Sequence, residues 1–109
     1  MNDVRRGEVW WGEDPSAGRR PFLVLSRDEV IPILRTVLAV PATRTVRGIP
    51  SEVRIGPDDG MPAECALSFD NATVLDQSLL VERICRLDPS KLAAACRAWN
   101  AAVGCTAPS

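Results

Sequence analysis

Short apolar runs, each bounded by turn residues, recur through the first 87 residues of the chain. Gly, Pro, Asp and Ser, the residues that favour turns, separate these runs. The predicted strands cover residues 7–13, 21–26, 36–43, 48–56 (centred on 52–55), 64–69 and 81–87. Five or six short strands at this spacing predict a mainly β fold, a small closed or nearly closed barrel. Residues 70–80 are expected to be a short irregular connection.

The last part of the chain changes to a helical pattern. Asp88 is suited to be the N-cap of a helix whose first residue is Pro89, and Gly104 is suited to end it. Apolar residues at helical spacing form the stripe Leu92, Cys96, Trp99 and Val103. We therefore expect one amphipathic C-terminal helix that packs on the sheet through this stripe.

The tryptophans are assigned from their positions in these elements. Trp99 lies on the helical stripe and is interpreted as a core or dimer contact. Trp10 and Trp11 are neighbours on a predicted strand, so they face opposite sides. One of the two can belong to the core, which leaves the other for a surface or an interface.

The composition is that of one globular domain, residues 1–109, with 46% hydrophobic and 25% charged residues and a net charge of -1. Residues 1–54 hold nine arginines against seven acids, and residues 55–109 hold four basic residues against seven acids, so the first half is mildly basic. All basic residues except Lys91 are arginine, whose planar guanidinium matches phosphate and carboxylate oxygens. Because neither a signal peptide nor a membrane-spanning run is found, a cytoplasmic location is expected.

The missing residue types exclude several kinds of site. Without histidine the chain cannot form an imidazole-based nuclease or hydrolase centre. It has neither a GxxxxGKS/T phosphate loop nor a GxGxxG motif. Adjacent acids occur only at 13–14, 28–29 and 58–59, in predicted turns, where solvated charge explains them better than Mg²⁺ binding.

The four cysteines form no CxxC pair, so no structural metal is expected. They are Cys65, Cys85, Cys96 and Cys105. In a reducing compartment such residues are interpreted as small buried apolar side chains with free thiols.

What remains is arginine combined with hydroxyl groups. In the stretch GRRPFLVLSRD, Arg19 and Arg20 stand directly before a run predicted to be a buried strand. If the barrel closes, they can face Thr43, Arg44 and Thr45 at the end of a neighbouring strand and form an anion site. The alternative, in which Arg20 pairs with a carboxylate and Thr43 only fills a strand position, stays open from the pattern alone.

Several segments follow one another in a known order. They are RRGEVWW (5–11), RRPFLVLSRD (19–28), VLAVPATRTVRGIPSEVRI (37–55), CALSFDNATVL (65–75) and ICRL (84–87), followed by the terminal helix. Together they closely resemble the MazF/PemK (Kid-like) family of toxin endoribonucleases. The resemblance implies a small SH3-like barrel of five to seven short strands with a C-terminal helix. It also implies a homodimer that cleaves single-stranded RNA at short sequences without a metal or another cofactor.

The resemblance also implies roles for individual residues. Arg20 and Thr43 are the expected catalytic pair. RNA contacts are expected from Arg19, Arg44, Thr45, Arg47 and Asn71. The RNA 2′-hydroxyl attacks its own phosphodiester and leaves a 2′,3′-cyclic phosphate and a 5′-hydroxyl, while Arg20 stabilises the developing charge and Thr43 orients the phosphate. The general base stays unassigned, with Glu8 and Glu52 as candidates because both lie near matched motifs.

Two departures from the family pattern affect the expected RNA specificity. The loop over residues 12–19 is short, and Asp70–Asn71 stands where many relatives carry an acid followed by Gln. Both changes are expected to alter base recognition rather than mechanism.

The resemblance implies a partner and leaves rival functions open. A cognate antitoxin is expected to wrap the toxin with a flexible acidic segment, which suits a positive rim around Arg20, Arg44 and Arg47. The first rival is a non-catalytic toxin like CcdB, which uses the same barrel to bind DNA gyrase. The second is a catalytically silent module that binds single-stranded nucleic acid or an antitoxin alone.

Overall fold

The computed structural model describes residues 3–16 and 18–104. Its seven strands are β1 (Glu8–Asp14), β2 (Gly18–Val24), β3 (Thr36–Thr43), β4 (Glu52–Ile55), β5 (Cys65–Ser68), β6 (Thr73–Asp76) and β7 (Leu80–Arg86). One helix, α1 (Pro89–Val103), follows the strands, and three single 3₁₀ turns connect them: η1 (Pro57–Asp59), η2 (Phe69–Asn71) and η3 (Gln77–Leu79). The chain is therefore mainly β with a C-terminal helix, as predicted.

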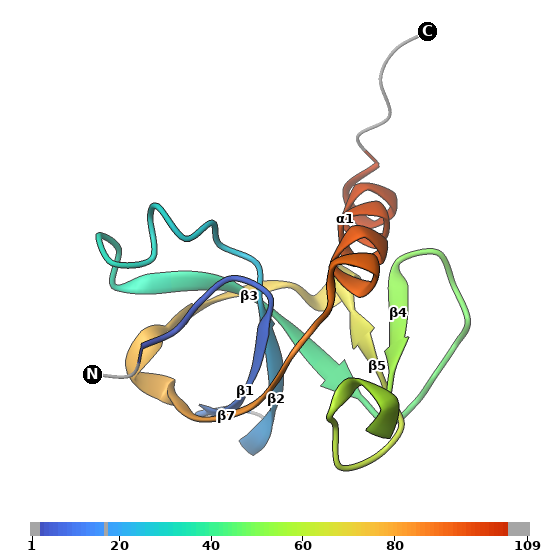
Figure 1. Ribbon diagram of the computed structural model, residues 1–109, viewed down its shortest axis with the longest axis horizontal. Coiled ribbons are helices and arrows are strands. Elements are labelled where there is room, and N and C mark those ends of the chain that lie inside the picture. Colours follow the sequence, from blue (N-terminus) through green and yellow to red (C-terminus); the bar gives the residue numbers. More distant parts are fainter. Residues whose placement is uncertain (1–2, 17, 105–109) are drawn as a thin grey trace, which may run out of the picture.

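The strands form one antiparallel, strongly curled sheet (Figure 1). Its order is β4-β5-β3-β2-β1-β7, and β6 pairs with the first half of β3. β3 pairs with three strands along its length: its first half pairs with β6, residues 39–41 pair with β2, and Ala42 and Thr43 pair with β5. This half-barrel confirms the predicted small SH3-like barrel.

One predicted element is wrong. Residues 70–80 were expected to be irregular, but they contain β6, which pairs with β3 from Thr36–Asp76 to Ala39–Thr73. The strand carries only one buried apolar residue, Leu75, while Val74 is 65% exposed. Its conformation is set by hydrogen bonding to a strand far away in the sequence, which a local apolar pattern does not report.

The central strands separate two apolar cores by strict alternation. On β2, Leu23 belongs to the core beneath α1, while Phe22 and Val24 belong to the core inside the curled sheet. On β1, Val9 faces the first core and Trp10 the second. Trp11 is half-buried on the outside, so the prediction of one core and one surface tryptophan is confirmed.

The helix begins and ends as predicted but buries a different face. Asp88 accepts a hydrogen bond from the Lys91 amide at 2.9 Å, and Gly104 adopts the left-handed conformation that ends the helix. The buried residues are Ala95 and Ala98, with Leu92, Ala94, Trp99 and Ala102 partly buried around them. Cys96 and Val103 are exposed, contrary to the predicted stripe, because α1 lies so close to β4 and η2 that alanine fits the contact. None of the helices formed by the described residues is long and apolar enough to cross a membrane.

Candidate functional site

The antiparallel pairing of β2 with β3 puts the two predicted catalytic residues, Arg20 and Thr43, at the same end of the strand pair. Phe22 pairs with Pro41, and the register continues through Leu23–Val40. The paired residues end at Phe22–Pro41, and the same register continued by two residues would align Arg20 with Thr43. Both residues stand at even spacing from their paired neighbours, so their side chains leave the same face of the sheet.

Arg20 is a half-buried arginine whose guanidinium is unpaired. Within the described residues it makes no ion pair and no side-chain hydrogen bond, whereas the other half-buried arginine, Arg6, donates to the Leu25 carbonyl at 2.7 Å. The alternative in which Arg20 pairs with a carboxylate is therefore not what the fold contains. A guanidinium with free donors is suited to bind a phosphate.

Gly12 of β1 keeps space open beside Arg20. The two residues are paired across β1 and β2. A Cβ atom at Gly12 would lie 2.6 Å from Cδ2 of Phe22, which is fully buried. The glycine thus lets the Phe22 ring sit under the strand end from which Arg20 projects, a close approach that the sequence motif did not reveal.

Thr43 is half-buried at the end of β3. Its Oγ1 accepts a hydrogen bond from the Thr45 amide at 3.2 Å, which leaves the hydroxyl proton free to donate. The exposed loop that directly follows Thr43 contains three of the predicted RNA contacts, Arg44, Thr45 and Arg47.

Arg19 does not join Arg20 and Thr43. As its neighbour on β2, it leaves the opposite face of the sheet. Its guanidinium lies 5.1 Å from the centre of the Trp11 ring and 3.3 Å from a carboxylate oxygen of Glu82 on β7. The structure therefore does not bring the Arg19 side chain to that of Arg20, and its expected contact with RNA stays a prediction.

Asn71 lies exposed in η2, where its side-chain amide donates to Ser68 Oγ at 2.9 Å. The preceding Asp70 accepts a hydrogen bond of 2.5 Å from Ser51 Oγ. Since Ser51 ends the loop that follows β3, this contact ties η2 to that loop. Asn71, the residue after Asp70, therefore lies close to the end of that loop.

Neither candidate general base has an open carboxylate. Glu8 is 4% exposed and accepts hydrogen bonds from the Arg5 amide, Trp10 Nε1 and Arg83 Nη1 at 2.8, 3.0 and 3.1 Å. The Glu52 side chain is 3% exposed, and its Oε1 accepts two backbone N–H groups. Both carboxylates are buried and accept hydrogen bonds from the chain, a structural role that proximity to a motif could not distinguish from catalysis.

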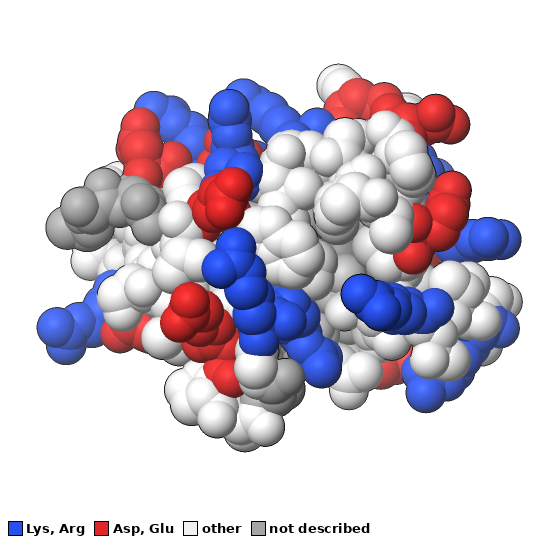
Figure 2. All heavy atoms as spheres, turned by 90° about the horizontal axis from the view of Figure 1, so that it is seen from below, with Lys and Arg blue, Asp and Glu red and all other residues white. Residues whose placement is uncertain are grey.

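Charge on the surface is mixed rather than concentrated. Figure 2 shows arginine and lysine side chains spread over one face among acidic ones, with broad areas of uncharged atoms between them. A protein of net charge -1 with this distribution has a weak general attraction for nucleic acid, so binding depends on a few well-placed arginines.

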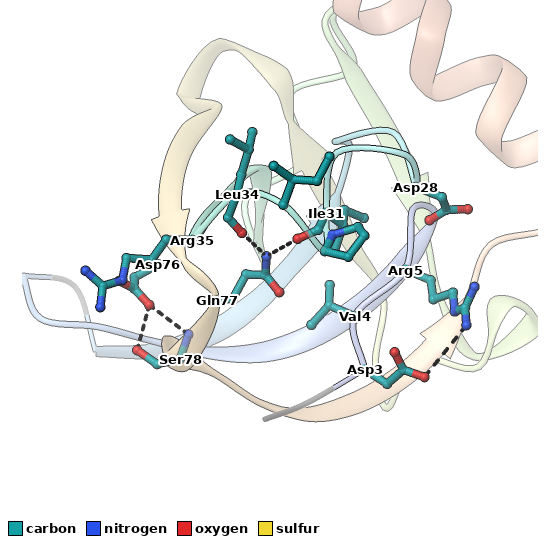
Figure 3. Close-up of a pocket in the computed structure, with 12 residues that line it drawn as sticks. Asp3, Val4, Arg5, Asp28, Ile31, Leu34, Arg35, Asp76, Gln77 and Ser78 are labelled. Atoms are coloured by element: carbon teal, nitrogen blue, oxygen red, sulfur yellow. Dashed lines mark hydrogen bonds and ion pairs between the residues drawn. The ribbon is translucent and has the colours of Figure 1, made fainter.

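A large groove lies away from this site. A groove of about 1060 Å³ lies between the N-terminal segment, the 28–35 loop and η3 (Figure 3). Gln77 closes one side by donating to the carbonyls of Ile31 and Leu34 at 2.8 and 2.7 Å. These residues follow β2 and precede β3, so the groove stands at the opposite ends of those strands from Arg20 and Thr43.

The cysteines differ in their surroundings. Cys65 is buried and Cys85 half-buried, and burial is the main cause that raises the pKa of both thiols. Cys96 is exposed, so the prediction of a buried residue is wrong there, and Cys105 lies outside the described residues. In the part of the chain that the structure describes, no group of three His, Cys, Asp or Glu residues is arranged to hold a metal ion.

The fold is a small β half-barrel with a terminal helix, and the predicted catalytic residues Arg20 and Thr43 stand at one end of its β2–β3 strand pair. The family model described as "PemK-like, MazF-like toxin of type II toxin-antitoxin system" matches residues 5–102. The chain therefore belongs to this family, and the predicted resemblance is confirmed.

Individual relatives agree with this assignment. The probable endoribonuclease MazF5 of Mycobacterium tuberculosis is 44% identical over 102 residues, which is 93% of this chain and 94% of that protein. MazF2 of the same species, also a probable endoribonuclease, is 40% identical over 94% of this chain and all of its own. Among solved structures, a mycobacterial endoribonuclease in complex with its cognate antitoxin has a TM-score of 0.84 and 28% identity, covering 96% of this chain and 99% of its own.

Proposed function

We propose that this chain is the toxin of a toxin–antitoxin system and acts as a metal-independent endoribonuclease on single-stranded RNA. The observation that supports the proposal is Arg20, a half-buried residue whose guanidinium has no partner among the described residues and which stands at the same end of the β2–β3 pair as Thr43. Its relatives named as endoribonucleases support the reaction class. The comparisons do not favour the gyrase-binding alternative.

The proposed reaction is transfer of the phosphodiester to the adjacent 2′-hydroxyl. The 2′-oxygen bonds to phosphorus, the bond to the 5′-oxygen breaks, and the products carry a 2′,3′-cyclic phosphate and a 5′-hydroxyl. Negative charge grows on the non-bridging oxygens, where the fixed guanidinium of Arg20 stabilises it more than it stabilises the ground state. The free hydroxyl proton of Thr43 donates to the same phosphate and fixes its orientation.

The partners follow from the same proposal. Arg44, Thr45, Arg47 and Asn71 contact the RNA strand on either side of the cleaved phosphate. The protein acts as a homodimer in the cytoplasm, where its RNA substrate is found. A cognate antitoxin inhibits it with an acidic segment, as the antitoxin complexes of its structural neighbours support.

The experiment that tests this function is RNA cleavage in EDTA, with mapping of the new ends. The wild-type protein is expected to make discrete cuts that leave 5′-hydroxyl ends, and Arg20→Ala to make none. Arg97→Ala, which removes an exposed arginine of α1, is the matched control and is expected to cut as the wild type does. Intact RNA with the wild type, or equal cutting by Arg20→Ala, would contradict the proposal.

A further inference from the structure

We propose that Glu52 is a positioning residue that holds the basic loop over residues 44–50 beside Thr43 and so sets the affinity for RNA. This inference rests on the proposed function. It assigns a task to a buried carboxylate that the reaction itself does not use.

The loop has little structure of its own. All seven residues from 44 to 50 are exposed and none belongs to a strand, and in Figure 1 the loop forms the green right-hand edge of the molecule. The amides of Arg47 and Gly48 both donate to one oxygen, Oε1 of Glu52, at 2.9 and 3.1 Å. Gly48 has a φ of +69°, which glycine adopts readily, so the chain can turn both amides towards the carboxylate.

Glu52 itself is held firmly. It begins β4, pairs with Ser68 of β5, and its amide donates to the Ile49 carbonyl at 3.0 Å. β5 in turn pairs with the end of β3, where Thr43 lies opposite Ala66. One strand, β5, lies between Glu52 and β3. Thr43, Ala66 and Arg54 lie opposite one another across β3, β5 and β4, and Glu52 is two residues before Arg54 on β4. This paired position makes Glu52 a rigid anchor for the loop.

The second carboxylate oxygen has no evident use in the fold. Oε2 of Glu52 is buried and lacks a hydrogen-bond partner, the one such side-chain atom among the described residues. A buried oxygen without a partner costs stability, so packing alone does not explain the charge. The nearest cation is the Arg47 guanidinium, whose Nη1 lies 4.0 Å away while the side chain is 59% exposed. The carboxylate attracts Arg47 without occupying all its donors, which leaves them for a phosphate.

Loss of the Glu52 anchor is expected to weaken RNA binding without slowing the chemical step. A loop that loses its anchor presents Arg44 and Arg47 in many arrangements, and ordering them on RNA then costs entropy. This cost falls on the ground state and the transition state alike, so KM rises while kcat stays nearly constant. A direct role of Glu52 as the base would instead lower kcat.

The test compares Glu52→Ala with Glu52→Gln in steady-state cleavage of a short RNA. Glutamine keeps an oxygen for the two loop amides and is expected to hold KM within about threefold of the wild type, whereas alanine is expected to raise KM roughly tenfold, equivalent to one lost charge-assisted hydrogen bond. In both variants kcat is expected to stay within about threefold. An unchanged KM in folded Glu52→Ala, or an equally large fall of kcat in both variants, would overturn the proposal.

Amide hydrogen exchange keeps the test independent of activity and of variant folding. In the wild type, the Arg47 and Gly48 amides are expected to exchange more slowly than those of Arg44 and Val46, which donate to no acceptor among the described residues. Glu52→Ala should remove this protection and Glu52→Gln should keep it. Equal exchange across the loop in the wild type contradicts the anchor. If exchange follows the proposal but the wild type cuts no RNA, the proposed function fails and the anchor stands.

Discussion

Arg20 lies near the start of β2 and Thr43 ends β3, and because the two strands pair antiparallel, both residues stand at the same end of the strand pair. Under the proposed function, this guanidinium and this hydroxyl act on one phosphate without a metal ligand. The rigidity comes from the buried continuation of both strands, where Phe22 and Leu23 are almost fully enclosed. This relationship explains why arginine occurs where the chain is about to enter the core.

Arg20 is expected to serve catalysis and not stability. Arg20→Lys keeps the charge but loses the planar pair of donors, so kcat is expected to fall about 100-fold. Since the guanidinium has no partner among the described residues, the midpoint of thermal unfolding is expected to shift by less than about 3 °C. Parallel kinetic and melting measurements check both statements, and a large loss of stability would show that Arg20 is a structural residue.

Gly12 is expected to tolerate no side chain. A Cβ atom there meets the Phe22 ring at 2.6 Å, so Gly12→Ala should destabilise the chain by about 1–3 kcal/mol in urea unfolding. Adding Phe22→Leu should recover part of this loss because it removes the opposing ring atoms. Strictly additive effects of the two substitutions would contradict the contact.

The helix cap is expected to titrate in acid. Hydrogen bonds from the Lys91 amide and the Ser90 hydroxyl hold the pKa of Asp88 below its ordinary value. A carboxyl whose pKa is lowered by folding contributes stability above its unfolded pKa and loses that contribution as the pH falls through the folded pKa. The Asp88→Asn variant keeps a capping oxygen but cannot ionise. The difference in the free energy of unfolding between the wild type and Asp88→Asn, measured in urea, should therefore disappear below about pH 4. A difference that does not depend on pH would contradict the prediction.

The thiols are expected to react in the order of their exposure. Alkylation at pH 8, followed by peptide mass spectrometry, should label Cys96 well before Cys85 and Cys65. Burial raises the pKa of the two slower thiols, and the negative charge of Glu64 adds to the effect at Cys65. Labelling of all three at one rate in the native protein would show that the core around Cys65 opens readily.

Signals that act locally were enough to predict much of the fold. The central position of β2 followed from apolar residues on both faces, and the helix ends followed from Asp88 and Gly104. β6 was missed because its pairing with β3 depends on residues far apart in the chain. The buried face of α1 was misjudged because Ala95 and Ala98 give a weaker apolar signal than Cys96 and Val103, yet only small residues fit so close to β4.

The sequence predicted which residues belong to the candidate site, but not how their side chains are arranged. The predicted strand began at residue 21, so strand alternation was not applied to Arg19 and Arg20; β2 begins at Gly18, and the two arginines therefore leave opposite faces. Nothing in the residue pattern distinguished an anchoring carboxylate from a base at Glu52. The local feature of this anchor is its spacing: Glu52 starts a strand and lies five residues after Arg47 and four after Gly48.

The central claim is that Arg20 and Thr43 act on one phosphate as a unit, and a double-mutant cycle on kcat tests it most directly. The rates of the wild type, Arg20→Ala, Thr43→Val and the double variant would be measured on one RNA in EDTA. Residues that act together are non-additive, so the double variant is expected to be about as slow as the slower single variant. Multiplication of the two single effects would contradict the account, because it would mean that Arg20 and Thr43 act at separate places.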